Sequence, residues 1–297
     1  MTRREFAVAA AGPALPQSPR SAFKKSICSI VFPSGLPAAE RFRQARNAGF
    51  EGIEIRLGEE IRLSSTPEEV KRVGDEARKA GVAISALWVS EGLGDHPLND
   101  PSAEVRAAGA AAIEKAIEFA TYLPCPALLL VPARLGAGPK FRVGYQDTWN
   151  RVTAELRKLV PHAAKARVIL GPENVWNKFL VSPLEMRSFV DQFESPWLQT
   201  FFDVGNVMQF GYPQDWILTL GRRIKNVHLK DYKLSTRAEQ GRFVELWDGD
   251  VDWKEVMAAL VKVGYQGFLA PEYDGDPNDP ARLRKLSALT DKILAAV

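Results

Sequence analysis

Short apolar, β-rich runs alternate with longer segments of helical periodicity from Lys24 to the end of the chain. In the longer segments, such as 37–49, 66–81 and 252–264, hydrophobic positions recur every three or four residues, which is typical of amphipathic helices. The pattern predicts eight consecutive strand–helix units. The predicted strands lie at residues 26–31, 52–57, 82–89, 127–132, 167–174, 199–205, 224–230 and 267–273.

Individual residues indicate where some of these helices begin and end. Thr66 precedes Pro67, and two glutamates follow, a combination that favours the first turn of a helix. Glycine often ends a helix because it adopts a left-handed backbone conformation without strain. Three glycines occur where a helix should give way to the next strand: Gly49, Gly81 and Gly264.

Eight strand–helix units in roughly 270 residues match the size of a single (β/α)8 TIM barrel, an α/β fold, which we assign to residues 23–297. The alternative is a doubly wound open sheet. No Gly-x-Gly-x-x-Gly turn follows the first predicted strand, so the dinucleotide-binding form of that sheet is unsupported. Strands covered by helices on both faces should also be apolar throughout, whereas several of these strands alternate.

The strand predicted at 52–57 shows this alternation clearly. Ile53 and Ile55 share one face, and Glu54 and Arg56 share the other. In a barrel the apolar face meets the helices and the polar face enters the interior. We therefore expect Glu54 and Arg56 to face inward and to form a buried ion pair.

The last four predicted strands each end in a residue that can bind a metal ion: Glu173, Asp203, His228 and Glu272. Each residue alone has an ordinary structural explanation. Together, however, three carboxylates at the mouth of one barrel would repel one another and lose hydration, a cost that a divalent cation removes. One imidazole with three carboxylates suits Mn²⁺, Mg²⁺, Co²⁺ or Zn²⁺. We therefore predict one divalent metal ion at this end of the barrel.

Composition and charge exclude several classes of partner. The net charge of +3, from 39 basic and 36 acidic residues among 297, is too small to predict a nucleic-acid-binding surface. No stretch of about 18 apolar residues predicts a membrane span. The two cysteines, Cys28 and Cys125, form neither a disulfide framework nor a zinc motif.

The N-terminal residues 1–22 stand apart from the repeating pattern. Arg3 and Arg4 are followed by an alanine-rich stretch, which resembles a twin-arginine export signal. The other interpretation is a disordered tail. The protein is accordingly expected in the cytoplasm, or in the periplasm if the Arg3–Arg4 segment works as a signal.

Four stretches, PENVWNKFLVSPLEM, FFDVGNV, NVHLKD and APEYDGD, resemble the sugar phosphate isomerase/epimerase family with a xylose isomerase-like TIM barrel. The resemblance covers residues 24–297, and the family includes ketose 3-epimerases, hydroxypyruvate isomerases and inosose dehydratases. It implies one divalent cation, Mn²⁺ foremost, held by the four strand-end residues. It also implies that Glu173 and Glu272 act as an acid–base pair.

These residue types fit chemistry at a carbon next to a carbonyl group. We predict 3-epimerisation of a sugar or sugar phosphate through a metal-stabilised cis-enediolate, with one glutamate removing a proton and the other returning one. Aldose–ketose isomerisation of the hydroxypyruvate isomerase type and inosose dehydration remain alternatives. A DNA-repair endonuclease is excluded, because its metal cluster needs many histidines and this chain has three. A homodimer or homotetramer is also expected.

Further residues are candidates for substrate binding. Asn206 occupies the position where free-ketose 3-epimerases commonly carry a histidine. Lys230 shares a strand face with His228 and could reach a substrate oxygen or phosphate. Trp176 and Trp88 could pack against a sugar, and His96 lies in a loop that could cover the site.

Overall fold

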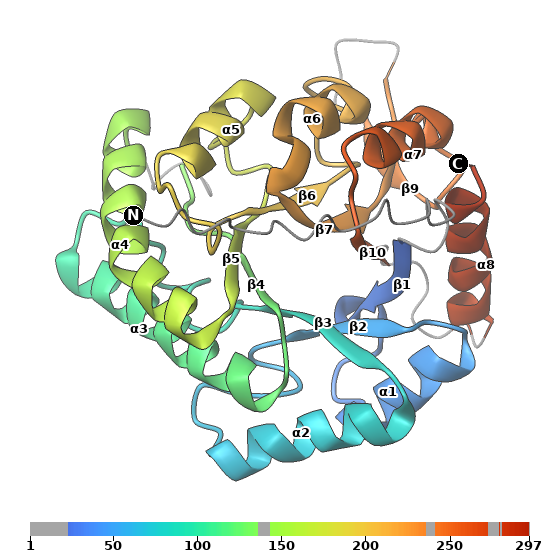
Figure 1. Ribbon diagram of the computed structural model, residues 1–297, viewed down its shortest axis with the longest axis horizontal. Helices are drawn as coiled ribbons and strands as arrows, with labels where there is room; N and C mark the ends of the chain where they lie inside the picture. Colours follow the sequence, from blue (N-terminus) through green and yellow to red (C-terminus); the bar gives the residue numbers. More distant parts are fainter. Residues whose placement is uncertain (1–22, 136–142, 236–240, 273–278, 280, 297) are drawn as a thin grey trace, which may run out of the picture.

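The computed structural model describes residues 23–135, 143–235, 241–272, 279 and 281–296. A ring of helices surrounds eight parallel strands, which form a nearly closed barrel (Figure 1). The predicted single (β/α)8 barrel is therefore confirmed. The barrel strands are β1 (Phe23–Cys28), β2 (Gly52–Arg56), β3 (Ala83–Trp88), β4 (Ala127–Leu130), β5 (Ile169–Pro172), β6 (Thr200–Asp203), β7 (Ile224–Leu229) and β10 (Gly267–Pro271).

Hydrogen-bonded neighbours run in the order β5-β4-β3-β2-β1-β10-β7-β6. Two isolated parallel bridges, Leu170 with Leu198 and Glu173 with Phe201, join β5 to β6 and bring the two ends of the sheet together. The outer helices are α1 (Ala38–Asn47), α2 (Pro67–Ala80), α3 (Ala103–Tyr122), α4 (Tyr145–Ala166), α5 (Pro183–Asp191), α6 (Pro213–Leu220), α7 (Trp253–Lys262) and α8 (Arg282–Leu294).

The predicted helix ends are confirmed. The Thr66 hydroxyl accepts a hydrogen bond from the Glu69 backbone N–H at 3.2 Å, and the Glu69 carboxylate accepts one from the Thr66 N–H at 2.9 Å. This reciprocal cap stabilises the start of α2 by about 1 kcal/mol. The three predicted terminal glycines have positive φ angles of 94°, 74° and 69° at Gly49, Gly81 and Gly264.

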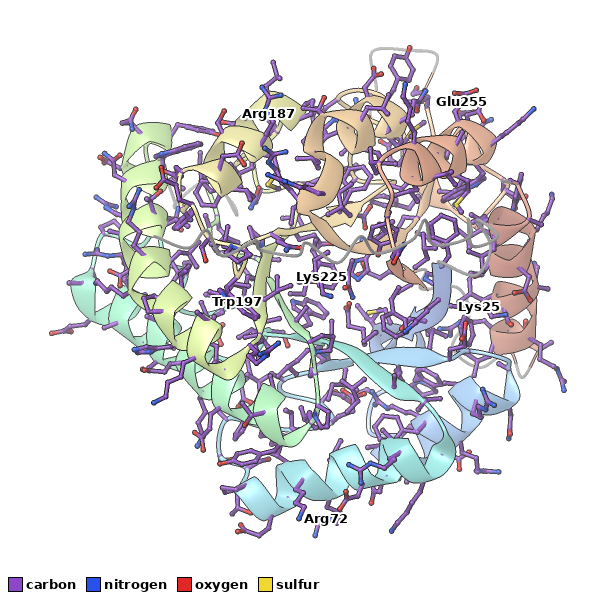
Figure 2. All side chains as sticks on the ribbon, viewed as in Figure 1. Lys25, Arg72, Arg187, Trp197, Lys225 and Glu255 are labelled. Atoms are coloured by element: carbon purple, nitrogen blue, oxygen red, sulfur yellow. The ribbon has the colours of Figure 1, made fainter. Side chains whose placement is uncertain are left out.

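Two apolar cores support the barrel. The larger one lies between the strands and the helices, whose outer faces carry exposed charged side chains such as Arg72 and Glu255 (Figure 2). The smaller one lies inside the barrel and consists of Ala86, Ala127, Leu129 and Phe201.

The Phe201 ring closes the barrel interior beneath the strand ends. Gly171 makes room for this ring, because a Cβ atom there would lie 2.8 Å from a Phe201 ring carbon. On its other side, the ring packs edge-on against the His228 imidazole, with centroids 5.2 Å apart. The smaller core therefore forms an apolar floor under the polar residues at the mouth.

The loop after β7 folds into a hairpin of β8 (Asp231–Lys233) and β9 (Arg242–Val244). The buried carboxylate of Asp231 accepts hydrogen bonds from the backbone N–H groups of Tyr232, Trp247 and Val251. It also accepts one from the Trp253 indole at 3.0 Å. These four donors fix the hairpin against the start of α7, so it is held in place beside the barrel mouth.

Two sequence-based expectations concern other parts of the chain. Within the described ranges, no helix has the length and apolar character needed to cross a membrane. The segment predicted as an export signal or disordered tail, residues 1–22, lies outside the described residues.

Candidate metal centre

The four predicted ligand residues come together at the C-terminal ends of four strands that are neighbours around the barrel. Asp203 is the last residue of β6, and His228 is the penultimate residue of β7. Glu173 and Glu272 directly follow β5 and β10. One potential ligand atom from each residue lies within 4.8 Å of the others, which is compact enough to surround one cation.

The His228 imidazole forms the centre of this cluster. Its Nδ1 atom lies 2.9 Å from Glu272 Oε2, 3.0 Å from Glu173 Oε1 and 3.9 Å from Asp203 Oδ2. Lys230 directly follows β7, and its Nζ atom lies 2.9 Å from Glu272 Oε2 and 3.1 Å from Asp203 Oδ2. The Asp203 and His228 side chains are 0% and 2% exposed, whereas those of Glu272 and Lys230 are 14% and 18% exposed. The cluster therefore opens to solvent on the side of Glu272 and Lys230.

The buried carboxyl groups have displaced pKa values. Burial disfavours the charged form, so it raises the pKa of Glu173 to about 7 and also raises the pKa of Asp203. Burial acts on Glu272 too, but the charges of Lys230 and His228 outweigh it and lower the pKa of Glu272 to about 2. The two glutamates thus differ in proton affinity, as acid–base pairs in enzymes often do.

The cations in the cluster are held by the surrounding negative charge. Burial opposes the charged imidazole, yet the carboxylates of Glu54 and Glu272 outweigh that effect and raise the pKa of His228 well above its usual range. Burial likewise opposes the charge of Lys230, while Asp203 and Glu272 raise its pKa. The cluster therefore attracts positive charge strongly.

The donor set fits a divalent cation. The buried oxygens Asp203 Oδ2 and Glu272 Oε2 receive no well-directed hydrogen bond from the described residues, although Lys230 lies within ion-pair distance of both. Buried carboxylate oxygens without such partners are costly unless a cation binds them. Together with Glu173 and the Nδ1 atom of His228, they form an oxygen-rich set that suits Mn²⁺ or Mg²⁺.

Neighbouring amides hold Asp203 in place. Asp203 Oδ1 accepts a hydrogen bond from the Asn206 backbone N–H at 2.7 Å, and the Asn174 amide bonds both the N–H and the C=O of Asp203. The side-chain N–H of Asn206, a predicted substrate contact, donates instead to the Asn174 carbonyl at 2.9 Å. Asn206 therefore contributes to the shape of the Asp203 loop, and its role in substrate binding stays a prediction.

Trp176 and Lys230, both predicted to contact substrate, meet at an aromatic cluster beside the site. The Trp176 ring lies 5.0 Å from that of Phe243 and 5.6 Å from that of Tyr232, and Lys230 Nζ lies 5.6 Å from the Phe243 ring centre. Trp176 and Phe243 are 37% and 39% exposed, so they offer a solvent-accessible aromatic surface. Phe243 was not singled out individually from the sequence, because the hairpin that carries it has no strong motif.

The remaining predicted contacts lie near other loops. The Trp88 ring, at the end of β3, lies under the Arg56 guanidinium at 5.6 Å. His96 Nδ1 lies 2.9 Å from the Gly92 carbonyl oxygen within the loop that follows β3. Contacts of Trp88 and His96 with substrate stay predictions.

The expected ion pair between Glu54 and Arg56 was wrong. Arg56 is the last residue of β2, and its long side chain reaches the following loop, where it donates to Glu59 at 3.0 Å. Glu54 lies two residues deeper in the barrel and contacts His228 and Cys28 instead. Strand alternation correctly predicts that both side chains share one face of β2. They lie at different depths in the barrel, however, and therefore contact different partners.

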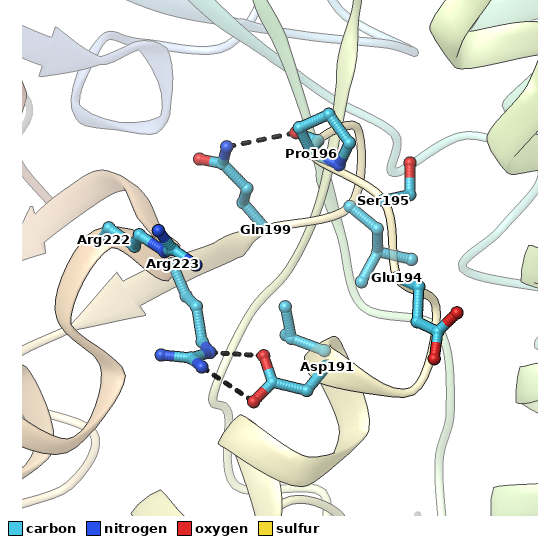
Figure 3. A pocket seen from close by; sticks show the side chains of 9 residues that line it. Asp191, Glu194, Ser195, Pro196, Gln199, Arg222 and Arg223 are labelled. Carbon is cyan, nitrogen blue, oxygen red and sulfur yellow. Dashed lines mark hydrogen bonds and ion pairs between the residues drawn. The ribbon is translucent and has the colours of Figure 1, made fainter.

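A cavity of 460 Å³, shown from close by in Figure 3, is lined by residues other than those of this cluster and lies at the opposite end of the barrel. Its lining includes Gln199, directly before β6, and Arg222 and Arg223, directly before β7, which are N-terminal strand ends. Arg223 is already paired with Asp191, with one N–O distance of 2.7 Å. Since the predicted chemistry requires the C-terminal strand ends, this cavity is not the candidate active site.

Comparisons with known proteins agree with the fold. A model of the family described as xylose isomerase-like TIM barrel matches residues 42–293. The L-ribulose-5-phosphate 3-epimerase UlaE of Escherichia coli O1:K1 is 26% identical over 267 residues, which cover 86% of this chain and 91% of that protein.

Two solved structures show the same fold. A D-psicose 3-epimerase from Clostridium cellulolyticum H10, determined with D-tagatose, superposes with a TM-score of 0.75 at 16% identity, over 92% of this chain and 99% of that one. A xylose isomerase-like TIM barrel protein from Mycobacterium smegmatis, in complex with magnesium, superposes with a TM-score of 0.73 at 15% identity, over 93% of this chain and 97% of that one.

Proposed function

Since this chain belongs to the xylose isomerase-like TIM barrel family, we propose that it is a metal-dependent 3-epimerase of a ketose or ketose phosphate. Its curated relatives are named epimerases, so the expected isomerase class of enzyme is confirmed. The main support for metal-dependent 3-epimerisation is the convergence of four ligand-type side chains, with a glutamate on each flank of the Asp203–His228 pair.

The metal centre would be held by Glu173, Asp203, His228 and Glu272, with Mn²⁺ as the first choice of cation. When bound, the cation would supply Lewis-acid stabilisation of the negative charge that develops on the substrate's carbonyl oxygen as the neighbouring carbon loses its proton. The apolar floor at Phe201 closes the site from below. The substrate must therefore approach from the open side, where Glu272 and Lys230 are partly exposed.

The two glutamates would carry the proton transfers. They lie at the ends of β5 and β10, which flank β6 and β7 around the barrel, so they can face a bound substrate from two sides. One carboxylate removes the proton from C3, and the other delivers a proton to the opposite face of the planar intermediate. The proton count is unchanged, and the configuration at C3 is inverted.

The substrate would bind against Lys230, Trp176 and Phe243. The Lys230 ammonium, already shared between two carboxylates, can donate a hydrogen bond to a substrate hydroxyl or phosphate oxygen. The exposed rings of Trp176 and Phe243 provide an apolar surface of the kind that packs against the C–H face of a sugar. The name of the Escherichia coli relative favours a ketopentose phosphate among the substrates to be tested.

A panel of free and phosphorylated ketoses, incubated with the Mn²⁺-loaded protein in D₂O, tests this proposal. After removal of Mn²⁺ with a chelator, NMR of the recovered sugars reports the product and the carbon that acquired deuterium. Inversion with deuterium at C3 supports 3-epimerisation. Deuterium and rearrangement at C1–C2 would identify an aldose–ketose isomerase, and loss of a hydroxyl group would identify a dehydratase.

Metal removal should abolish turnover without unfolding the barrel. The two apolar cores do not involve the ligand residues, so the fold should persist in EDTA. Free Mn²⁺ at 100 times its Kd should then stabilise the protein by about 2.7 kcal/mol and raise the Tm by several degrees. Thermal melts in EDTA and in Mn²⁺, followed by circular dichroism, measure this difference. Unfolding by EDTA at room temperature would contradict the proposal that the scaffold is independent of the metal.

The assembly and the compartment remain predictions. A homodimer or homotetramer would be detected by sedimentation equilibrium of the full chain. Fractionation of the source cell would decide between the cytoplasm and the periplasm.

A further inference from the structure

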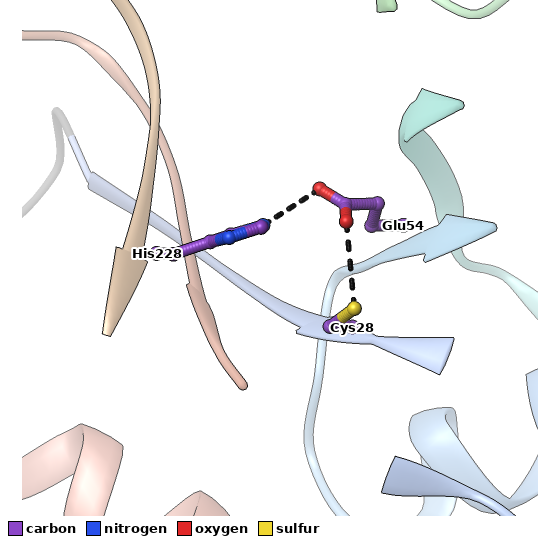
Figure 4. A group of neighbouring side chains, drawn as sticks. All are labelled: Cys28, Glu54 and His228. Carbon is purple, nitrogen blue, oxygen red and sulfur yellow. Dashed lines mark hydrogen bonds and ion pairs between the residues drawn. The ribbon is translucent and has the colours of Figure 1, made fainter. Parts of the chain in front are cut away.

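The two ring nitrogens of His228 have different surroundings. Nδ1 faces the three carboxylates of the candidate metal centre, at distances of 2.9 to 3.9 Å. Nε2 points away from them, across the barrel interior, to Glu54 Oε2 at 3.0 Å (Figure 4). An imidazole can bind a metal through one nitrogen while the other donates its N–H to an acceptor. The arrangement identifies Nδ1 as the metal-facing nitrogen and Nε2 as the donor.

Glu54 is a buried carboxylate in an unusual position. It is the third residue of β2, its side chain is 1% exposed, and β1 and β10 separate its strand from β7. Among the described residues, the ion pairs of Glu54 involve His228 and neither a lysine nor an arginine. Burying a carboxylate without a permanent cation is costly. The contact with His228 is therefore the interaction that compensates the charge of Glu54, and it links Glu54 to the candidate metal centre.

Cys28 holds the second oxygen of Glu54. Cys28 lies beside Glu54 in the β1–β2 register, and its Sγ donates to Glu54 Oε1 at 3.4 Å. Burial, and then the negative charge of Glu54, raise the pKa of the Cys28 thiol well above its usual range, so the thiol keeps the proton that it donates. The Glu54 carboxylate is thereby oriented from one side by Cys28 and bonded to His228 on the other.

We infer that Glu54 is a positioning residue of the metal centre, which accepts the Nε2–H of His228 and leaves the Nδ1 lone pair for the cation. The inference rests on the proposed function, because it assumes that His228 is a metal ligand. A carboxylate in this position fixes the tautomer, sets the orientation of the ring and increases the electron density on the ligating nitrogen. Glu54 therefore acts through His228 and needs no contact with the substrate.

The substitution Glu54→Gln tests this role with little change in shape. Loss of the negative charge should weaken Mn²⁺ binding by roughly 10- to 100-fold, the usual effect of removing a partner of a metal-bound histidine. Free Mn²⁺ measured by electron paramagnetic resonance during a titration gives the Kd directly. The matched control is Glu60→Gln, which removes an equally buried carboxylate, 1% exposed, that is paired with Arg41 outside the cluster. The control should lose stability but keep the wild-type Kd.

A second measurement is made on the wild-type protein and does not depend on the folding of a Glu54 variant. The chain has three histidines, so ¹⁵N-labelled histidine gives a spectrum simple enough to assign with His96→Gln and His162→Gln. In the Zn²⁺-loaded protein, which is diamagnetic, His228 should be the Nε2–H tautomer with its proton shifted strongly downfield by Glu54. An Nδ1–H tautomer would overturn the inference.

The outcomes separate this inference from the proposed function. A Kd for Glu54→Gln equal to that of the wild type would overturn the role of Glu54 and leave the metal centre standing. Failure of the wild-type protein to bind Mn²⁺ or Zn²⁺ would overturn both. A weakened Kd in Glu54→Gln, an unchanged Kd in Glu60→Gln and the Nε2–H tautomer together would establish Glu54 as the positioning residue.

Discussion

Glu173→Gln and Glu272→Gln should each lower turnover by about 10²- to 10⁴-fold while the barrel remains folded. Glutamine keeps the shape and one potential ligand oxygen of glutamate, but it cannot accept a proton from carbon. Steady-state assays on the ketose identified by the substrate panel, with saturating Mn²⁺, measure the loss. Circular dichroism and the Kd for Mn²⁺ show whether folding and metal binding have survived, which separates a lost base from a lost ligand.

The two variants should differ in the partial reaction that each retains. If one base works on each face of the substrate, one variant should still exchange the C3 proton with deuterium from the remaining face without forming the epimer. Deuterium in the recovered substrate and in the product, followed separately by NMR, detects this behaviour. Near-normal turnover in either variant would remove that glutamate from the mechanism and direct attention to Lys230, whose Nζ lies 2.9 Å from Glu272.

His228→Ala and Asp203→Ala should abolish both stoichiometric metal binding and turnover. His228 Nδ1 lies at the centre of the ligand set, and Asp203 Oδ2 is a fully buried oxygen without a well-directed hydrogen bond among the described residues. Removing either leaves too few donors to repay dehydration of the cation. Metal content after dialysis, measured by inductively coupled plasma mass spectrometry, gives the stoichiometry directly.

His162→Ala is the matched control for the histidine substitution. His162 lies in α4, one of the outer helices, where its exposed ring is paired with Glu114 at 2.7 Å. This variant should bind one metal ion per chain and turn over at the wild-type rate. Retention of stoichiometric metal by both His228→Ala and Asp203→Ala would show that the metal site lies elsewhere.

Local sequence patterns were sufficient to predict the architecture. The alternation in Glu54 and Arg56, the cap at Thr66 and the terminal glycine Gly81 each depend on residues close together in the chain. Strand periodicity decides which side chains face inward, and barrel topology brings the C-terminal strand ends to one rim. For that reason, the convergence of Glu173, Asp203, His228 and Glu272 could be predicted before the structure was known.

The tertiary structure alone decided which inward-facing residues touch. The sequence placed Glu54 inside the barrel but indicated the wrong partner, because Arg56 is its neighbour in the chain whereas His228 is 174 residues away. Such contacts depend on the stagger of strands around the barrel and on the depth of each side chain, which no local pattern records. The same holds for Phe243, which pairs with Tyr232 across the β8–β9 hairpin and whose ring centre lies 5.6 Å from Lys230 Nζ. Short-range periodicity therefore determined the fold and the set of candidate metal ligands, while long-range packing determined which residues contact them.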